Sequence, residues 1–324
     1  MMWTELAAIL AGFALLAWSA DRFVVGASAI AYNLKVSPLI IGLTIVGLGT
    51  SAPEMLVSLV ASWQGNSGLA VGNALGSNII NTGLILGITA MVIPLKVHSS
   101  IIKRELPVLL LVMVIALLLL LDGTLGRLDG MILLTGMALV VIWLIRVGLK
   151  QTTPEDPMGG EFADEMPMDM GMGRALFWLI VGALCLLGSS RLLVWGAVSV
   201  AESMGISDLV IGLTVVALGT SLPELAASVM SALKNEHDIA LGNVIGSNIF
   251  NLLVVLGLPG LINPGAIDAE VLTRDFPVMI GLTLALFVMA YGFRGPGRVN
   301  RFEGALLVAG FCGYQTLLYF SQLA

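Results

Sequence analysis

The chain has 324 residues, of which 58% are hydrophobic and 11% are charged, and its mean hydropathy is +1.00. So few polar side chains cannot cover a water-soluble globule, which predicts an integral protein of the lipid bilayer. The net charge of −6 argues against a nucleic-acid partner. The cysteines, Cys185 and Cys312, lie in separate apolar runs, which favours buried thiols over a disulfide or a metal pair.

The apolar runs are long enough for membrane-spanning helices, which need about 20 residues each. Bounded by charged residues, Pro or Gly clusters, they predict an all-α integral membrane protein with ten transmembrane helices rather than a β-barrel. Residues 1–20 lack a basic n-region and a small-residue cleavage site, so the first run is expected to remain as a helix. The ten runs lie near residues 5–30, 37–62, 70–93, 104–121, 128–147, 174–201, 207–232, 239–262, 274–292 and 302–320.

The basic residues of the loops predict an orientation in the membrane. If the N-terminus lies outside, the outside loops contain only Arg127 and Arg274 as basic residues. This bias predicts both termini on the periplasmic or extracellular side of a bacterial or archaeal plasma membrane. The inside loops then hold Lys35, Lys96, Lys103, Arg104, Arg146, Lys150, Arg174, Lys234, Arg294, Arg298 and Arg301.

Other polar residues have ordinary structural explanations. Arg22 and Arg191 fall within spans, where we expect them to snorkel or to anchor a helix end. His98 and His237 fall in predicted inside loops and are expected at the surface. Residues 151–173 are acidic and rich in Met and Gly, and we expect a solvated cytoplasmic linker because their spacing fits no EF-hand loop.

One apolar run ends in a carboxylate. Residues 42–54 read Gly-Leu-Thr-Ile-Val-Gly-Leu-Gly-Thr-Ser-Ala-Pro-Glu. A charge inside a bilayer costs about 3 kcal/mol or more, so Glu54 is a candidate functional residue. The same pattern returns at residues 212–224, which end in Glu224.

The repeat extends over the chain at a constant offset. A second motif, residues 72–81, returns at residues 242–251, and the offset is 170 positions (220 − 50 and 251 − 81). Residues 1–150 and 174–324 are therefore predicted to be two five-helix repeats joined by the linker. An odd number of spans inverts the second copy, as in many secondary transporters. Helices 2 and 7, which carry the first motif, are expected to be broken at the midplane.

The spacing within the motifs gathers oxygen atoms. Thr50 and Glu54 are four residues apart and share one face of a helix. Pro53 has no N–H for the carbonyl of Gly49, so a kink that exposes backbone oxygens is expected. The second repeat has the same spacing at Thr220, Pro223 and Glu224, and the second motifs pair Ser77 with Asn81 and Ser247 with Asn251.

Two carboxylates, several hydroxyls, two amide oxygens and some carbonyls make a hard, all-oxygen site without His or Cys. Such a site selects Ca²⁺, Na⁺, Mg²⁺ or H⁺ and disfavours Zn²⁺ or Cu²⁺. A charge of −2 neutralises one Ca²⁺ or two Na⁺, which is the physical logic of an antiporter. Four further amides are open to either a ligand role or hydrogen bonding between helices: Asn73, Asn78, Asn243 and Asn248.

The paired Gly-Thr-Ser-x-Pro-Glu and Gly-Ser-Asn-x-x-Asn motifs resemble the two alpha-repeats of the sodium/calcium exchangers in the calcium/cation antiporter superfamily. The likeness spans the ten predicted helices and is closest to compact prokaryotic exchangers, because residues 148–173 leave no room for a large regulatory domain. It implies that helices 1 and 6 slide against a fixed eight-helix core to alternate access.

The resemblance also implies roles for individual residues. Glu54 and Glu224 would be central Ca²⁺ ligands, assisted by Thr50 and Thr220. The flanking Na⁺ sites would use Ser51, Ser77, Ser221 and Ser247 with backbone oxygens of Gly47 and Ala217. Asn81 corresponds to an amide of related exchangers, whereas the position of Asn251 is often Asp in that family.

Asn251 removes one potential negative charge, so the coupling ion is open. Ca²⁺/Na⁺ antiport is the leading prediction, with Ca²⁺/H⁺ antiport or an exchanger that involves K⁺ as the alternative. An intramembrane phosphatase would need Arg or Lys beside its acid, which neither motif contains, so no enzyme activity is expected. A passive cation channel could also use glutamates. We expect no permanently bound cofactor and infer no obligate protein partner; the partners are the transported cations and the bilayer.

Overall fold

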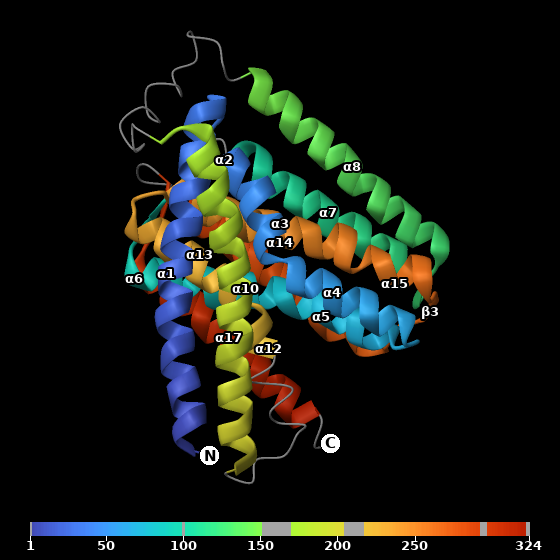
Figure 1. Cartoon of the computed structure of the whole chain (residues 1–324). Coiled ribbons are helices and arrows are strands. Elements are labelled where there is room, and N and C mark those ends of the chain that lie inside the picture. Colours follow the sequence, from blue (N-terminus) through green and yellow to red (C-terminus); the bar gives the residue numbers. More distant parts are fainter. Residues whose placement is uncertain (1, 99–100, 151–169, 204–216, 292–296, 322–324) are drawn as a thin grey trace.

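The computed structural model describes residues 2–98, 101–150, 170–203, 217–291 and 297–321, and almost all of them are helical. The elements of the first half are α1 (Met2–Leu34), α2 (Pro38–Ile41), η1 (Gly42–Val46), α3 (Gly47–Thr50), α4 (Ala52–Trp63), α5 (Ser67–Ile79), η2 (Ile80–Ile85), α6 (Leu86–Val92), β1 (Leu95–Lys96), η3 (Ile101–Glu105), α7 (Leu106–Leu120), β2 (Thr124–Leu125) and α8 (Arg127–Lys150). Those of the second half are α10 (Met172–Ser203), α12 (Ala217–Thr220), α13 (Leu222–Leu233), α14 (His237–Phe250), η5 (Asn251–Val255), α15 (Gly257–Ile262), β3 (Gly265–Ala266), η6 (Val271–Asp275), α16 (Phe276–Ala290), β4 (Arg298–Val299) and α17 (Arg301–Ser321). Segments labelled η are π-helical turns within longer helices (Figure 1).

Several of these helices are long and apolar enough to cross a membrane. Within the described residues six pass this test, or seven when the bent pair Pro38–Thr50 and Ala52–Trp63 counts as one span. The chain is therefore a multi-pass membrane protein, as its composition predicts. The predicted number of ten is not reached by this criterion, partly because residues 204–216, where helix 7 is expected to begin, lie outside the described part.

The two halves repeat the same elements at the offset expected from the sequence. Helices α4 and α13 begin and end 170 positions apart (222 − 52 and 233 − 63), and so do α7 and α16 (276 − 106 and 290 − 120). The short strands pair across the halves, because β1 is antiparallel to β4 and β2 is antiparallel to β3. The halves are therefore interlocked rather than lying side by side as separate domains.

Helices α1 and α10 run alongside each other and cross the remaining helices at a steep angle (Figure 1). Glycines allow their backbones to touch: a Cβ on Gly182 would lie 2.6 Å from the nitrogen of Phe23, and one on Gly26 would lie 2.5 Å from the nitrogen of Leu179. Residues of this pair belong to a second hydrophobic cluster, separate from the larger core, that also contains Ile41, Val46, Ala227 and Ile239 of the neighbouring helices.

Helix α14 lies at the centre of the molecule, and all 14 of its residues are buried. It crosses the first repeat closely, because a Cβ on Gly42 would lie 2.9 Å from the carbonyl oxygen of Ile239. This helix begins at His237, which is only 4% exposed. The expectation of a surface histidine is therefore wrong at this position, since α14 starts inside the packed structure.

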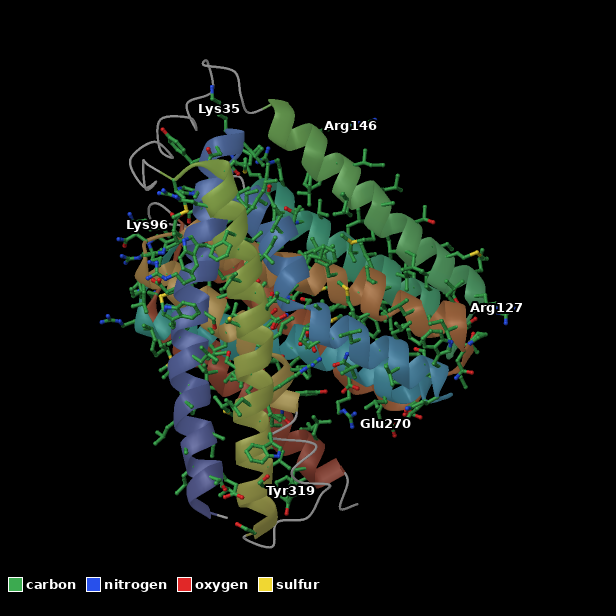
Figure 2. All side chains as sticks on the ribbon, viewed as in Figure 1. Lys35, Lys96, Arg127, Arg146, Glu270 and Tyr319 are labelled. Atoms are coloured by element: carbon green, nitrogen blue, oxygen red, sulfur yellow. The ribbon has the colours of Figure 1, made fainter. Side chains whose placement is uncertain are left out.

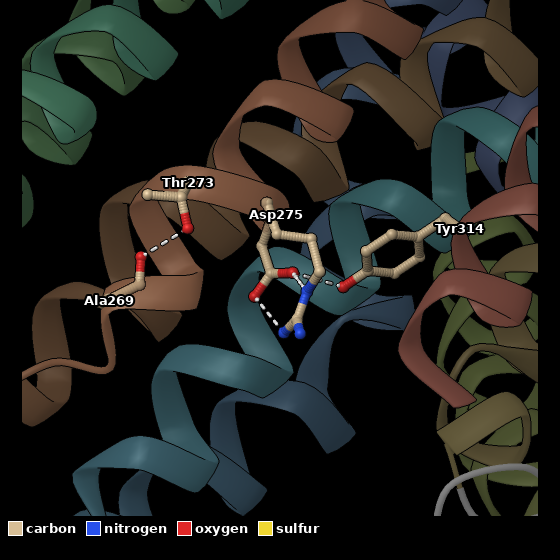
Figure 3. Close-up of polar contacts among 5 residues, drawn as sticks. Ala269, Thr273, Asp275 and Tyr314 are labelled. Carbon is tan, nitrogen blue, oxygen red and sulfur yellow. Dashed lines mark hydrogen bonds and ion pairs between the residues drawn. The ribbon is translucent and has the colours of Figure 1, made fainter. Parts of the chain in front are cut away.

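Charged residues begin the fourth helix of each half at matching positions. Arg274 Nε lies 2.7 Å from Asp275 Oδ1, and Arg104 Nη2 lies 3.4 Å from Glu105 Oε1. Figure 3 shows that Asp275 also accepts a hydrogen bond of 3.0 Å from the hydroxyl of Tyr314 on α17. The pair in the second half thus ties η6 and α16 to the last helix.

Candidate cation site

Each of the repeated carboxylates lies just after a break in a helix. Helix α3 ends at Thr50 and α4 begins at Ala52, with a bend of 47° between the two segments. Ser51 (φ −80°, ψ 6°) takes the position before α4, and Ser221 (φ −91°, ψ 4°) does the same for α13. The proline of each motif is tolerated here because the first turn of a helix needs no N–H at that position.

The breaks place Glu54 and Glu224 in the first turns of α4 and α13. A carboxylate there is stabilised by the partial positive charge of the helix N-terminus. The break also corrects one expectation, because Thr50 and Glu54 do not share a face of one continuous helix. Their relation is instead set by the turn at Ser51.

Hydrogen bonds connect the two repeats at this point. The Ser51 hydroxyl donates to Glu224 Oε1 over 3.1 Å, and the Thr50 hydroxyl donates to Asn243 Oδ1 over 2.9 Å. The first motifs of the two halves, which are 170 residues apart in the chain, therefore meet in space. This convergence was expected from the inverted repeat.

Several polar atoms of the repeated motifs are buried and lack a hydrogen-bond partner. Glu54 and Glu224 are each 1% exposed, and the Oε2 atom of each is unpaired. The hydroxyl of Ser221, Oδ1 of Asn81 and both amide atoms of Asn251 are also buried and unpaired. Buried polar atoms normally have partners, so the unpaired oxygens among them suit a cation.

The other predicted ligands are two serines of the second motifs and two backbone carbonyls. Ser77 and Ser247 are buried on α5 and α14, and the Ser247 hydroxyl approaches the carbonyl oxygen of Gly47 at 3.4 Å. That carbonyl also accepts from the backbone N–H of Ser51 at 3.0 Å, so it is already engaged in hydrogen bonds. Ala217 is the first residue of α12.

Thr220 is half-buried and lines a pocket of about 330 Å³. The pocket lies between α4, α10 and α12, and Arg191 and Ser190 of α10 contribute to its wall. Ser190 donates a 2.7 Å hydrogen bond to the carbonyl oxygen of Gly219, which the following proline leaves without a helical donor. Helix α10 is thereby attached to the break in the second repeat.

The structure resolves the roles of two asparagines that the sequence leaves open. Asn73 donates to the carbonyl oxygen of Glu54 over 3.0 Å, and Asn243 donates to that of Glu224 over 3.2 Å. Both amides thus hold the backbone of a glutamate, an arrangement that repeats in the two halves. The helical spacing of the sequence does not reveal these bonds, because donor and acceptor come from different helices.

The site has few ionisable groups. Within the described ranges no three His, Cys, Asp or Glu side chains gather in a way that could hold a metal ion. A cation at this point would therefore be held by the two carboxylates together with neutral oxygens, as a hard cation prefers.

Comparisons with known proteins agree with this geometry. The profile of the family described as sodium/calcium exchanger protein matches residues 4–146 and 174–320. The chain is 52% identical over 313 residues to CaxA of Alkalimonas amylolytica, a candidate antiporter. The alignment covers 97% of this chain and 98% of CaxA. It is 44% identical over 319 residues to the inner membrane protein YrbG of Escherichia coli, covering 97% and 96% of the two chains.

A solved structure has the same fold over nearly the whole chain. The sodium-calcium exchanger NCX_Mj superposes with a TM-score of 0.83 at 33% sequence identity, covering 96% of this chain and 98% of that chain.

Proposed function

Because the chain belongs to the sodium/calcium exchanger family, we propose that it is a secondary antiporter that exchanges Ca²⁺ for Na⁺ across a membrane. The observation that carries this proposal is the pair of buried glutamates, Glu54 and Glu224, each with an unpaired oxygen. The hydrogen bond from Ser51 to Glu224 connects the first motifs of the two repeats. Neither motif contains a basic residue to neutralise them.

The charge of this pair explains why exchange is favoured over one-way transport. Two carboxylates stripped of water are costly unless a cation neutralises them. One Ca²⁺ or two Na⁺ would do so, and an empty site with a charge of −2 would cross the barrier between the two access states poorly. Each crossing would therefore carry an ion, which couples the two fluxes.

We call the proposed ligand set the oxygen cage. It consists of side-chain oxygens from both repeats and two backbone carbonyls. Its members are Glu54, Glu224, Thr50, Thr220, Ser51, Ser221, Ser77, Ser247, Asn81 and Asn251, with the carbonyls of Gly47 and Ala217.

We further propose that the protein transports by alternating access and is built of two inverted five-helix repeats, residues 1–150 and 174–324. The cross-pairing of short strands and the matching bounds of α4 and α13 support the inverted arrangement. The close backbone contact of α1 with α10 at Gly26 and Gly182 supports their movement as a unit. Residues 151–173, the proposed cytoplasmic linker, fall largely outside the described residues.

The proposed orientation puts both termini outside. Of the residues predicted inside, Lys35 and Arg146 lie toward the top of Figure 2 and Lys96 toward its left, whereas Arg127 lies toward the right and Tyr319 toward the bottom. A membrane-impermeant thiol reagent added to intact cells should label a Gln64→Cys variant but not Lys35→Cys in a cysteine-free background. The reverse pattern would contradict this orientation.

Coupling to H⁺, or to K⁺ in addition, is the second candidate. Asn251 is the reason to test it, because an amide supplies one negative charge fewer than the Asp often found in the family, which changes the cation charge that the site can balance.

Proteoliposomes loaded with Na⁺ test the proposal and separate these candidates. An outward Na⁺ gradient at equal pH should drive uptake of radioactive Ca²⁺ without K⁺. Uptake driven by a pH gradient in the absence of Na⁺ would favour H⁺ coupling. Uptake that follows the Ca²⁺ gradient alone, with no dependence on a counter-ion, would contradict exchange.

A further inference from the structure

The Asn81 amide is held at one of its two polar atoms. Asn81 lies in η2 and is 1% exposed. Its Nδ2 donates a hydrogen bond of 3.1 Å to Oδ1 of Asn248 on α14. Its Oδ1 is buried and has no hydrogen-bond partner. The donor side of this amide is therefore occupied, and only its oxygen is open to an ion.

The Asn248 amide is itself fixed by a neighbour on η2. Its Nδ2 donates to the hydroxyl oxygen of Thr82 over 2.9 Å, and its backbone carbonyl accepts from Nδ2 of Asn78 over 3.3 Å. The Thr82 hydroxyl can donate as well as accept, so it holds the Asn248 amide in place without fixing which way round that amide lies. If the Asn248 amide alone turned over, its NH₂ group would face the NH₂ group of Asn81, and two donors would meet. Because Thr82, Asn81 and Asn248 are each only 1% exposed, water cannot relieve such a mismatch.

The second repeat lacks this arrangement. Asn251, the equivalent of Asn81, has no partner at either amide atom, and Oδ1 of Asn78, the equivalent of Asn248, is also unpaired. The sequence gives the reason, because the position that corresponds to Thr82 is Leu252 (82 + 170), which has no hydroxyl. The two amides of the proposed cage thus differ in how firmly they are held.

We propose that Asn248 and Thr82 are positioning residues that hold the Asn81 amide in place while its oxygen binds the transported cation. This inference rests on the proposed cation site. With the Asn81 oxygen on a cation, the Asn81 NH₂ group donates to Asn248 and the Asn248 NH₂ group donates to Thr82, so each amide in this relay of three side chains has an acceptor for its buried donor. Without these partners a buried NH₂ group has no acceptor in the cation-bound state, which weakens binding.

Substitutions at both ends of the relay test the proposal. Loss of partners outside the direct ligands commonly lowers metal affinity by about 10–100-fold, so Asn248→Leu and Thr82→Val should each raise the half-saturating concentration of Ca²⁺ or Na⁺ by about 10-fold or more. Thr82→Ser keeps the hydroxyl and should restore the wild-type value. Binding is read from the shift of the thermal unfolding midpoint of the purified full chain as Ca²⁺ or Na⁺ alone is added.

Thr89→Val is the matched control for Thr82→Val. Thr89 lies on α6, is 0% exposed, and donates over 2.7 Å to the carbonyl oxygen of Ile85 rather than to an amide of the relay. Its replacement should change stability without the loss of cation affinity. If Asn248→Leu does not fold, the contrast between Thr82→Val and Thr82→Ser decides the question.

A double-mutant cycle tests whether Asn248 acts through Asn81. In an Asn81→Ala background, Asn248→Leu should cause no further loss of cation affinity, because the amide that it positions is gone. Additive losses, or equal affinities in Thr82→Val and Thr89→Val, would overturn the positioning role alone. If the wild-type chain shows no cation-dependent shift at all, the proposed cation site fails and this inference fails with it.

Discussion

At the scale of single residues, the proposed function depends on two glutamates that the fold brings together. Glu54 and Glu224 are each buried in the first turn of a helix, and each keeps one oxygen without a partner. Pairing with a cation offsets the cost of burying both charges. Removing one charge should therefore affect ion binding far more than folding.

Replacement of either glutamate by glutamine is the corresponding prediction. Glu54→Gln and Glu224→Gln should each reduce Ca²⁺ transport by at least about 100-fold, because one remaining carboxylate cannot offset the desolvation of a divalent ion. Transport is measured as radioactive Ca²⁺ uptake into proteoliposomes with equal amounts of folded protein. Uptake like that of the wild type in either variant would remove that glutamate from the site.

Asn251 leads to a second prediction at this scale. Asn251→Asp adds a carboxylate beside atoms that have no hydrogen-bond partner, so the site should demand more neutralising charge. We expect a changed dependence of uptake on Na⁺ concentration and on pH, with a thermal unfolding midpoint in saturating cation close to that of the wild type. Unchanged Na⁺ and pH profiles would place Asn251 outside the ion path.

The sequence indicates candidate site residues but not their contacts. The repeated motifs single out Glu54 and Glu224 as candidates, since a duplicated intramembrane carboxylate has no simple structural purpose. The roles of Asn243 and Asn248 depend on distances between helices, which spacing along one chain does not contain. Burial of His237 is missed for the same reason, because it follows from the central place of α14.

At the scale of elements, prolines and glycines carry most of the predictive information. Pro53 predicts the interruption of the second helix, and the structure has a full break at Ser51 with a bend of 47°. The π-helical turns η2 and η5, which contain Asn81 and Asn251, are not predicted. A π-helical turn contains one residue more than an α-helical turn, and no particular residue type marks its position in a sequence.

The contact between α1 and α10 gives a prediction for an element. Gly182→Ala should destabilise the protein by about 1–3 kcal/mol, because its new methyl group would overlap the backbone of Phe23. Gly188→Ala lies on the same helix with open space around it and should have little effect or stabilise slightly. Thermal unfolding of both variants in detergent measures the difference. Equal unfolding midpoints would show that the two helices are not packed this closely.

At the scale of the whole molecule, the interlocked halves place both repeats around one site. The offset of 170 residues predicts this pseudo-symmetry from sequence alone, and the paired strands β1–β4 and β2–β3 agree with it. The differences between the halves matter as much for function. Thr82 of the first repeat corresponds to Leu252 of the second, so the Asn81 amide is held by hydrogen bonds through Asn248, while the Asn251 amide has no partner.

The central claim is that one oxygen cage holds either Ca²⁺ or Na⁺ but not both. Equilibrium binding of radioactive Ca²⁺ to the purified protein, titrated with Na⁺ at constant ionic strength, tests it most directly. We predict that Na⁺ displaces all specifically bound Ca²⁺, with more than one Na⁺ needed for each Ca²⁺, and that Glu54→Gln and Glu224→Gln bind almost none. Ca²⁺ that stays bound in saturating Na⁺, or that binds normally to the double variant, would contradict the account.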